Sequence, residues 1–398
     1  TKDHCAMVKP ESSPVGLFVF RNSTGAGTAS TMVRVAVNIR QGDLEPYYKA
    51  SYEDFKSGKL DISVAAIEMV FVPRGPYYLG DGISYDSFAD DEASPYLVTN
   101  EDSLTLRVKD GITQKLKTEQ AGLRKLYPKG YDGFYCMKYE ISQEQYVYFL
   151  NKLPYREQKK RIGNDLDQLK DRDYVFGDRT YPDARNGIIL LKRKTAGLDV
   201  TGNHGDTAVI FGHNLNQDDG IENSPRDGKT IACNFLTPED AKAYADWTGL
   251  RLMTELEYEK VCRLRNPENR PSGFQYAWNG STLYQLNGGL QTGTEGTVYE
   301  VAAGNANANA GGKFNGPVRC GSFARENTTY MSVTGASYWG AMDLTGNLSE
   351  MVCNAISGRK MVGIEGDGSL ASEVISWEKD TIINWYGSVG VPPYTERI

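Results

Sequence analysis

The sequence predicts an α+β protein in which loops outweigh regular structure. Apolar and aromatic residues occur in short, strand-sized runs bounded by turn residues, and a few segments carry clear helix caps. Glycine accounts for 42 of the 398 residues, which favours many turns. No run approaches the roughly 18 apolar residues that a membrane-spanning helix needs. We therefore expect a water-soluble, loop-rich chain without a membrane span.

The first 65 residues are expected to form a β-rich segment. Gly16–Arg21 and Thr31–Ile39 are runs of β-branched and aromatic residues, and the turn residues of Asn22–Ser30 separate them. Two strands are too few for a stable sandwich, so this segment is either the end of a β-domain or a sheet added to the next domain. Because the first residue is Thr1, we interpret the chain as a processed product, a fragment or part of a longer chain.

Residues 66–398 are expected to form a second domain. Within it, Glu68–Asp81 predicts a strand, a Pro/Gly turn and another strand. Ser142 opens a capping box, which predicts the start of a helix. Thr237–Trp247 predicts a longer helix, because a capping threonine precedes a proline and two acids. A further capping box at Thr254 predicts one more helix, which runs to about residue 263.

Two segments are candidate binding loops. Residues 155–229 are polar and rich in turn residues, and Gly, Asn and Asp are most frequent in Gly202–Asp227. A loop of that length is either functional or an insertion. Gly304–Gly312 is a second Gly/Asn-rich loop, which extends to Gly316. Because binding commonly resides in loops on a rigid scaffold, we expect recognition to involve these loops or the N-terminal segment.

Charge and cysteine spacing exclude several classes of protein. The net charge is −7, and no dense run of Lys and Arg occurs; the short cluster Lys192–Lys194 is best interpreted as a solvated strand end or loop. Nucleic-acid binding is therefore not expected, since it needs a basic face. The six cysteines include no C-x-x-C pair, which excludes a zinc ribbon or a thioredoxin-like site. Buried thiols and one or two disulfides both stay open.

Five segments, in order, resemble the formylglycine-generating-enzyme (sulfatase-modifying factor) family. The third, TIACNFLTPEDAKAYADWTGLRLMTELEYEKVCR, resembles the family's most diagnostic block, and the last, WGAMDLTGNLSEMV, resembles its G-N-x-W-E segment. The matching segments are Glu68–Gly80, Phe134–Phe149, Thr230–Arg263, Tyr276–Gly280 and Trp339–Val352. The resemblance implies a C-type-lectin-like α+β fold. It also leaves a scaffolding role for Trp247, Arg251, Glu257, Trp278 and Trp339, as core aromatics and an internal ion pair.

The resemblance breaks where the family's oxidases bind copper(I). Those enzymes carry two cysteines five residues apart, beyond the G-N-x-W-E segment and a G-G-S-W strand. Here Cys353 is the only cysteine after Cys320, and Gly366–Ser369 only faintly resembles G-G-S-W. The second domain is thus expected to lack the family's final strands, either because they lie outside this sequence or because this copy is divergent. We assign no catalytic or copper-binding residue.

An iron site of the family's ergothioneine-synthesis branch is also not expected. That branch builds its site on several histidines, and this chain has only His4, His204 and His213. The sequence instead resembles Bacteroidetes surface versions of the domain, which use the fold for display or assembly. The leading hypothesis is therefore a non-catalytic extracellular or cell-surface protein that binds a protein or a glycan, or that assembles with itself. The alternatives are a formylglycine-generating oxidase, and a structural subunit of a filament, gliding or secretion complex.

The resemblance further implies structural calcium. Asn347 and Glu350 match the family's ligand pair, and Asn307 with the Ala308 carbonyl matches a second ligand loop. The alternative is that these asparagines satisfy turn geometry. The 25 tyrosines are candidates for a recognition surface, although they are also suited to filling a β-rich core.

Overall fold

The structure is a computed structural model with short helices and short antiparallel strands, which confirms the α+β prediction. It describes residues 5–8, 18–21, 57, 65–81, 83–84, 87–110, 113, 115–193, 209–217, 220–263, 275–286, 290, 295–297, 299–302, 306–310, 315–324, 330–355 and 382–385. In this part of the chain, no helix has the length and apolar character needed to cross a membrane. Thr31–Ile39 lies outside the described residues, as do residues 304–305 and 311–312 of the Gly304–Gly312 loop.

The helices begin where the sequence places their caps. Ser142, Thr237 and Thr254 each accept a hydrogen bond from the third helical residue, whose side chain bonds back to the cap. These reciprocal bonds satisfy backbone groups that a helix end leaves unpaired. The helical elements are α2 (Gln143–Leu150), α3 (Tyr155–Lys160), η1 (Asp183–Arg185), α4 (Pro238–Trp247), α5 (Glu255–Cys262) and α6 (Met331–Thr334).

The strands are short, and every pairing is antiparallel. They are β1 (Cys5–Val8), β2 (Phe18–Arg21), β3 (Met69–Val72), β4 (Tyr77–Leu79), β5 (Ser87–Ala89), β6 (Tyr96–Val98), β7 (Leu104–Lys109), β8 (Leu116–Leu123), β9 (Phe134–Met137), β10 (Ile188–Arg193), β11 (Val209–His213), β12 (Glu350–Cys353) and β13 (Ile382–Trp385). The pairs are β1–β2, β3–β9, β4–β6, β10–β11 and β12–β13, beside the three-stranded sheet β5–β7–β8.

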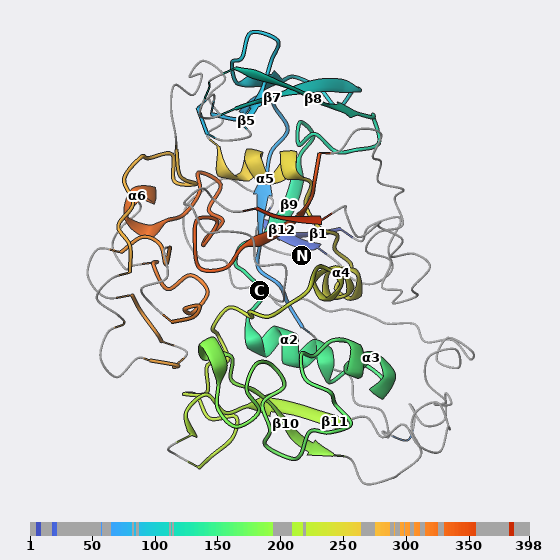
Figure 1. Cartoon of the computed structure of the whole chain (residues 1–398), viewed down its shortest axis with the longest axis vertical. Helices are drawn as coiled ribbons and strands as arrows, with labels where there is room; N and C mark the ends of the chain where they lie inside the picture. The colour runs from blue at the N-terminus through green and yellow to red at the C-terminus, as the bar shows by residue number, and fades with distance from the viewer. Residues whose placement is uncertain are drawn as a thin grey trace.

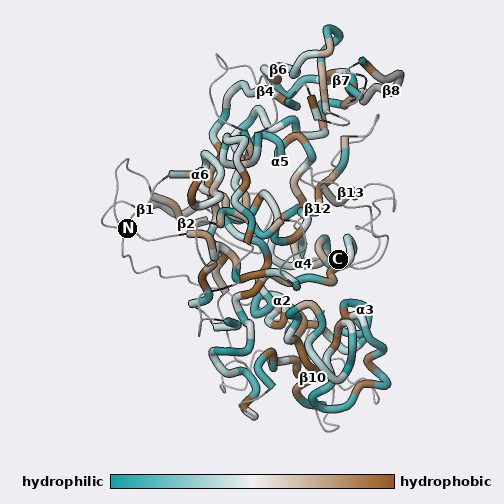
Figure 2. Tube along the Cα trace, turned by 60° about the vertical axis from the view of Figure 1, so that its left-hand side comes forward, coloured by the Kyte–Doolittle hydropathy of each residue, from teal (hydrophilic) through white to brown (hydrophobic). Residues whose placement is uncertain are grey.

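The elements form an upper, a middle and a lower region in Figure 1. The sheet β5–β7–β8 lies at the top, α5 lies with β9 and β12 in the middle, and α2 and α3 lie with β10 and β11 at the bottom. The largest apolar cluster joins α2 and α4 to β10 and β11. Figure 2 shows hydrophobic residues concentrated along β10, as expected of a strand in this cluster.

The two strands predicted in Glu68–Asp81 do not pair with each other. β3 pairs with β9, and β4 pairs with β6. The segment between them does not make a hairpin turn, because the Gly75 N–H instead donates to the Tyr131 carbonyl, 2.9 Å away. The strands thus belong to two different sheets.

The prediction that residues 155–229 are mainly loop is wrong in part. This region contains α3, β10 and β11, and β11 lies within Gly202–Asp227. Along one edge of β11, two side chains make the backbone hydrogen bonds that a neighbouring strand would otherwise make. Asn151 bonds to both the N–H and the C=O of Phe211, and Gln158 bonds to both groups of Val209. This stretch of the predicted recognition loop is therefore buried.

The cysteines whose side chains are described are free thiols. They are Cys136, Cys233, Cys262, Cys320 and Cys353. The interpretation as buried thiols holds for Cys136, Cys233 and Cys353, whereas Cys262 and Cys320 are free but only partly buried. The internal ion pair is also present, because the Arg251 guanidinium donates to both carboxylate oxygens of Glu257, at 2.6 and 2.7 Å.

Candidate functional site

Three acidic side chains from distant parts of the chain form a buried cluster, which we call the carboxylate cluster. Glu140 lies between β9 and α2, Asp343 lies in the loop before β12, and Glu350 is the first residue of β12. The Leu348 N–H donates to Glu140 Oε1 at 2.9 Å, and the Gly321 N–H donates to Asp343 Oδ2 at 2.6 Å.

Glu350 is held by an aromatic hydroxyl from α5. The Tyr258 hydroxyl lies 3.3 Å from Glu350 Oε2 and 2.7 Å from the Leu344 carbonyl oxygen. Burial, aided by the charge of Asp343, raises the pKa of Glu350 to about 8, although hydrogen bonds from its own backbone and from Tyr258 oppose the change. The position of Glu350 therefore favours the protonated acid at neutral pH.

The pKa values of Asp343 and Glu140 are also raised. Burial raises the pKa of Asp343 to about 6, although the Gly321 N–H and Arg319 oppose the change. Burial also raises the pKa of Glu140 well above its usual value, and the charges of Asp343 and Glu350 add to the effect. Three ionised carboxylates cannot share this space without protons or a cation, because like charges repel strongly away from water.

Two oxygen atoms of the cluster have no hydrogen-bond partner among the described residues. They are Asp343 Oδ1 and Glu350 Oε1, and both are buried. Buried polar atoms are normally hydrogen-bonded, since leaving one unsatisfied costs about 1–3 kcal/mol. The cluster is thus chemically suited to a hydrogen-bond donor or to a cation that prefers oxygen ligands. No three His, Cys, Asp or Glu side chains in the described residues are placed to hold a metal by themselves.

Of the four predicted calcium ligands, only Glu350 has an oxygen without a bond. Asn307 Oδ1 accepts from the Tyr284 N–H at 3.0 Å, and the Ala308 carbonyl accepts from the Leu286 N–H at 3.0 Å. Asn347 Oδ1 accepts from the Val318 N–H at 2.8 Å.

The asparagines also donate to the chain and stabilise its turns. Asn307 donates to the Ser332 carbonyl at 2.9 Å, and Asn347 donates to Glu140. Asn347 has a φ of 65°, which asparagine tolerates better than most residues. Turn formation thus accounts for both asparagine side chains. The structure groups Glu350 with Glu140 and Asp343, which the sequence-based search missed although both stand in segments that resemble the family.

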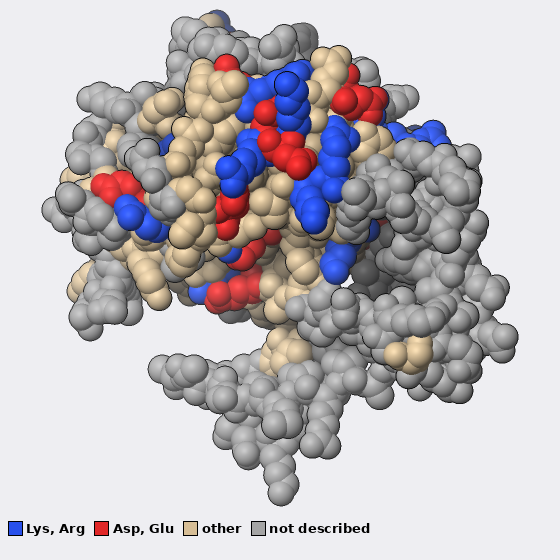
Figure 3. All heavy atoms as spheres, turned by 90° about the horizontal axis from the view of Figure 1, so that it is seen from below, with Lys and Arg blue, Asp and Glu red and all other residues tan. Residues whose placement is uncertain are grey.

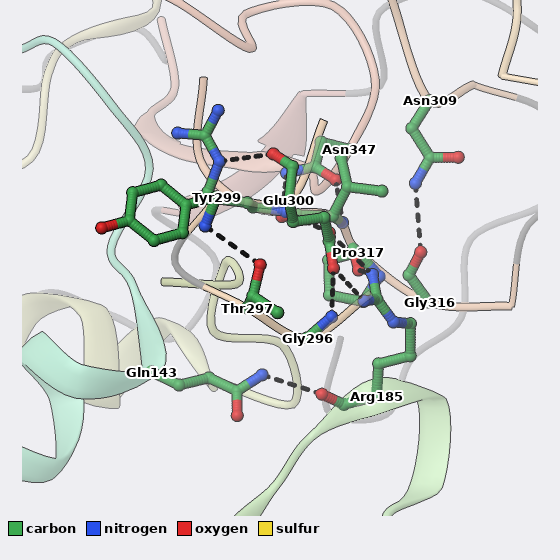
Figure 4. A network of polar contacts seen from close by, with 12 residues as sticks. Gln143, Arg185, Gly296, Thr297, Tyr299, Glu300, Asn309, Gly316, Pro317 and Asn347 are labelled. Atoms are coloured by element: carbon green, nitrogen blue, oxygen red, sulfur yellow. Dashed lines mark hydrogen bonds and ion pairs between the residues drawn. The ribbon is translucent and has the colours of Figure 1, made fainter. Parts of the chain in front are cut away.

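A second polar network fixes the Gly-rich loops beside the cluster. Figure 4 shows Glu300 at its centre, with Arg185 and Gly296. Glu300 is fully buried, and the Arg185 guanidinium and the Gly296 N–H donate to its carboxylate. Arg185 also donates to the Pro317 carbonyl at 2.6 Å. The network joins η1 to residues 295–302 and 315–319, so these loop segments have fixed positions.

The same region presents exposed aromatic side chains. Tyr284, Tyr299, Tyr330 and Tyr338 are 52, 78, 74 and 49% exposed. They come from the loop segments around α6, on the left of Figure 1. Exposed tyrosine offers a rigid contact area with a polar tip, as binding surfaces use.

The face seen from below carries both signs of charge. Figure 3 shows Lys and Arg interspersed with Asp and Glu there. Among the described residues, ion pairs such as Lys159 with Asp165 and Arg172 with Glu222 also join charges of opposite sign. The described part of this face thus offers a phosphate backbone no continuous basic patch.

Burial perturbs the described thiols. It raises the pKa of Cys136 to about 12, and it raises the pKa of Cys233, Cys262 and Cys320 well above the usual value. These four positions therefore favour the neutral thiol in the metal-free protein.

Comparison with known proteins gives one family match. The sequence model described as "Sulfatase-modifying factor enzyme 1-like domain" matches residues 61–376. This range covers most of the chain and begins close to the domain boundary predicted at residue 66. No curated protein matches the chain.

Proposed function

The chain belongs to the sulfatase-modifying factor family, and on this premise we propose that it is a non-catalytic scaffold that binds another macromolecule. The observation that carries the proposal is the group of exposed tyrosines on anchored loops. Tyr299 stands next to Glu300, whose carboxylate is bonded to Arg185 and the Gly296 N–H. An aromatic side chain on a fixed loop loses little conformational entropy on binding, which favours affinity.

The partner we propose is a protein or a glycan at the cell surface, or a second copy of the chain. Its interface should bury at least about 1,000 Å² in total. We also propose a C-type-lectin-like fold, an extracellular location and a relationship to Bacteroidetes surface proteins. The resemblance of the five sequence segments to the family supports these three assignments.

We also propose a structural calcium ion at the carboxylate cluster. Glu350 and Asp343 would supply two of its ligands, and backbone carbonyls and water would supply the others, because calcium prefers hard oxygen ligands. The two unpartnered oxygens on Asp343 and Glu350 support this choice. The ion would neutralise the repulsion between the acids and would stabilise the folded chain by mass action. This proposed set shares Glu350 with the ligands that the sequence resemblance implies, which also include Asn307, Ala308 and Asn347.

Site-specific photo-crosslinking in the native host tests the binding role. A photoreactive phenylalanine analogue replaces Tyr299 or Tyr330 in the full-length protein, and Leu126 serves as the control because it is 60% exposed in a different segment. Specific adducts from both tyrosine positions and none from Leu126 are expected. Absence of adducts at both tyrosines, with the protein running as a monomer, would contradict the binding role.

An oxidase assay tests the main alternative. The protein is incubated with copper(I), oxygen and a cysteine-containing sulfatase peptide, and mass spectrometry follows the peptide. We expect no aldehyde product, because this sequence has no pair of cysteines five residues apart after the segment that resembles G-N-x-W-E. Time-dependent formation of formylglycine would establish the oxidase instead.

A further inference from the structure

Two of the exposed tyrosines belong to chain segments that contact the same buried residue. Tyr284 is 52% exposed and Tyr330 is 74% exposed, whereas Asn307, which lies between their segments, is only 2% exposed. A buried polar side chain normally finds its hydrogen-bond partners inside the protein. The partners of Asn307 therefore indicate what its burial achieves.

The side chain of Asn307 bonds to both segments at once. Its Oδ1 accepts from the Tyr284 N–H at 3.0 Å, and its Nδ2 donates to the Ser332 carbonyl at 2.9 Å. A side-chain amide carries an acceptor and a donor on one rigid plane. A single amide group therefore fixes the spacing between the two segments.

The main chain beside Asn307 strengthens the contact with the first segment. The Asn307 N–H donates to the Tyr284 carbonyl at 2.8 Å, and the Leu286 N–H donates to the Ala308 carbonyl at 3.0 Å. Both backbone polar groups of Tyr284 are thus bonded to Asn307. The backbone of Tyr284 has a fixed position, while its ring is exposed to solvent.

The second segment is α6, which Tyr330 precedes as its N-cap residue. The Tyr330 carbonyl accepts from the N–H groups of Val333 and Thr334, at 3.0 and 3.2 Å. A helix of a single turn is not stable through its own hydrogen bonds, because forming the first turn is unfavourable. Contacts with the rest of the protein must therefore stabilise α6, and the bond from Asn307 to Ser332 is one of them.

The C-terminal end of α6 packs on the main chain of Asn307. Gly335 is the C-cap residue, with a φ of 69°, and an added Cβ would lie 2.2 Å from the Asn307 carbonyl oxygen. Glycine suits both this backbone conformation and this close approach. Asn307 thus contacts α6 through Ser332 and again through Gly335.

Tyr299 has a different support. Glu300 fixes its loop through bonds from Arg185 and the Gly296 N–H, which Figure 4 shows. Asn307 instead bonds to the segments of Tyr284 and α6. The exposed tyrosines therefore belong to at least two groups, each with its own buried anchor.

We propose that Asn307 is a positioning residue that holds Tyr284 and Tyr330 together as one binding unit, supported separately from Tyr299. The proposal rests on the binding role proposed above and adds the arrangement of the surface. Rings on segments of fixed spacing lose little conformational entropy when they meet one partner, which favours simultaneous contact. A change at Asn307 should therefore weaken binding at both tyrosines although neither ring is altered.

Two asparagine variants of the full-length protein test this role. Asn307→Ala removes both side-chain bonds. Asn309→Ala is the matched control, because the Asn309 amide lies in the same loop but donates to the Gly316 carbonyl, at 3.0 Å. Melting curves confirm that each variant is folded.

Hydrogen exchange followed by mass spectrometry measures the positioning in the absence of a partner. In Asn307→Ala, exchange should become at least about fivefold faster in segments 283–286 and 331–335, because the Tyr284 N–H loses its acceptor and α6 loses a support. Exchange in the segment of Tyr299 should not change. The Asn309→Ala control should leave 283–286 and 331–335 as in the wild type. Unchanged exchange in folded Asn307→Ala would overturn the proposal.

Photo-crosslinking in the native host measures the effect on binding. The photoreactive phenylalanine analogue replaces Tyr284 or Tyr330, and adduct yields at both positions should fall together by at least about fivefold in Asn307→Ala. Yields that do not fall, a loss at one tyrosine only, or an equal loss in Asn309→Ala would overturn the positioning role. If the wild type gives no adducts at Tyr284, Tyr330 or Tyr299, the binding role itself fails, and hydrogen exchange still shows whether Asn307 orders the two segments.

Gly335→Ala provides a second test if Asn307→Ala does not fold. It should separate α6 from Asn307 and lower the adduct yield at Tyr330, because the added Cβ clashes with the Asn307 carbonyl. Gly340→Ala is its control, since Gly340 also has a positive φ but an added Cβ there meets open space. Equal yields from these two variants would contradict the proposal.

Calcium distinguishes positioning from the ligand role that the sequence resemblance implies for Asn307. Hydrogen exchange of the wild type and Asn307→Ala is measured in chelator and in calcium. A positioning residue acts through bonds within the protein, so the difference between the two proteins should be present in both solutions. A difference that appears only in calcium would assign Asn307 to the metal and overturn the positioning role.

Discussion

Glu350→Gln replaces the most informative acid of the carboxylate cluster by a neutral side chain of nearly equal size. The folded-state pKa of Glu350 is raised from 4.5 to about 8. Stability associated with its protonated form is fully present below the unfolded-state value near 4.5 and is lost as pH rises through about 8. Glutamine resembles the protonated acid and does not ionise. Without a cation, the variant should therefore gain stability relative to the wild type as pH rises from about 5 to 8.

The shift in pKa sets the size of the effect. A change from 4.5 to about 8 has an upper limit of about 5 kcal/mol, at about 1.4 kcal/mol per pH unit. Water entry and relaxation around the ionised group reduce that limit. We expect the variant to be about 2 kcal/mol more stable than the wild type at pH 8, and nearly equal to it at pH 4.5 and below.

Chemical denaturation in chelator at pH 4.5, 6, 7 and 8 measures the difference. Glu92→Gln is the matched control, because Glu92 is exposed in a turn, and it should track the wild type at every pH. A second series in calcium should restore the wild type at pH 8 and leave Glu350→Gln unchanged. A difference between variant and wild type that does not change between pH 5 and 8 in chelator would refute the buried-acid reasoning. A wild type unaffected by calcium would refute only the ion.

Two further substitutions test how the site is supported. Thr254→Ala removes the cap of α5 and should lower the free energy of unfolding by about 1 kcal/mol, whereas Thr254→Ser should retain most of the stability. Equal melting temperatures for the wild type and both variants would show that the cap is dispensable. Gly316→Ala should cost about 1–3 kcal/mol, because Gly316 has a φ of 110° and an added Cβ would lie 2.3 Å from the Ala184 carbonyl oxygen. Gly220→Ala, also at positive φ but in open space, separates the backbone effect from the clash, and equal losses at both glycines would argue against tight packing at Ala184.

Local signals in the sequence predicted the helices well. Thr237 and Thr254 precede acids that close capping boxes within three residues, so all interacting groups lie in one short segment. Strand pairing was not predicted, because β3 and β4 are neighbours in sequence but take partners more than ten residues away. β11 was missed because its edge is satisfied by the side chains of Asn151 and Gln158, which leave no periodic pattern in its own sequence.

The same limitation affected the candidate site. Glu350 was recognised from its motif, but its neighbour Glu140 stands about 210 positions earlier in the chain. No short-range pattern indicates that these carboxylates meet, since the contact depends on how β9 and β12 are placed around α5. The sequence could not show which tyrosines lie at the surface, because their number was compatible with both a recognition surface and a core. The structure distinguishes them, since Tyr299 and Tyr330 are exposed whereas Tyr77 and Tyr146 are buried.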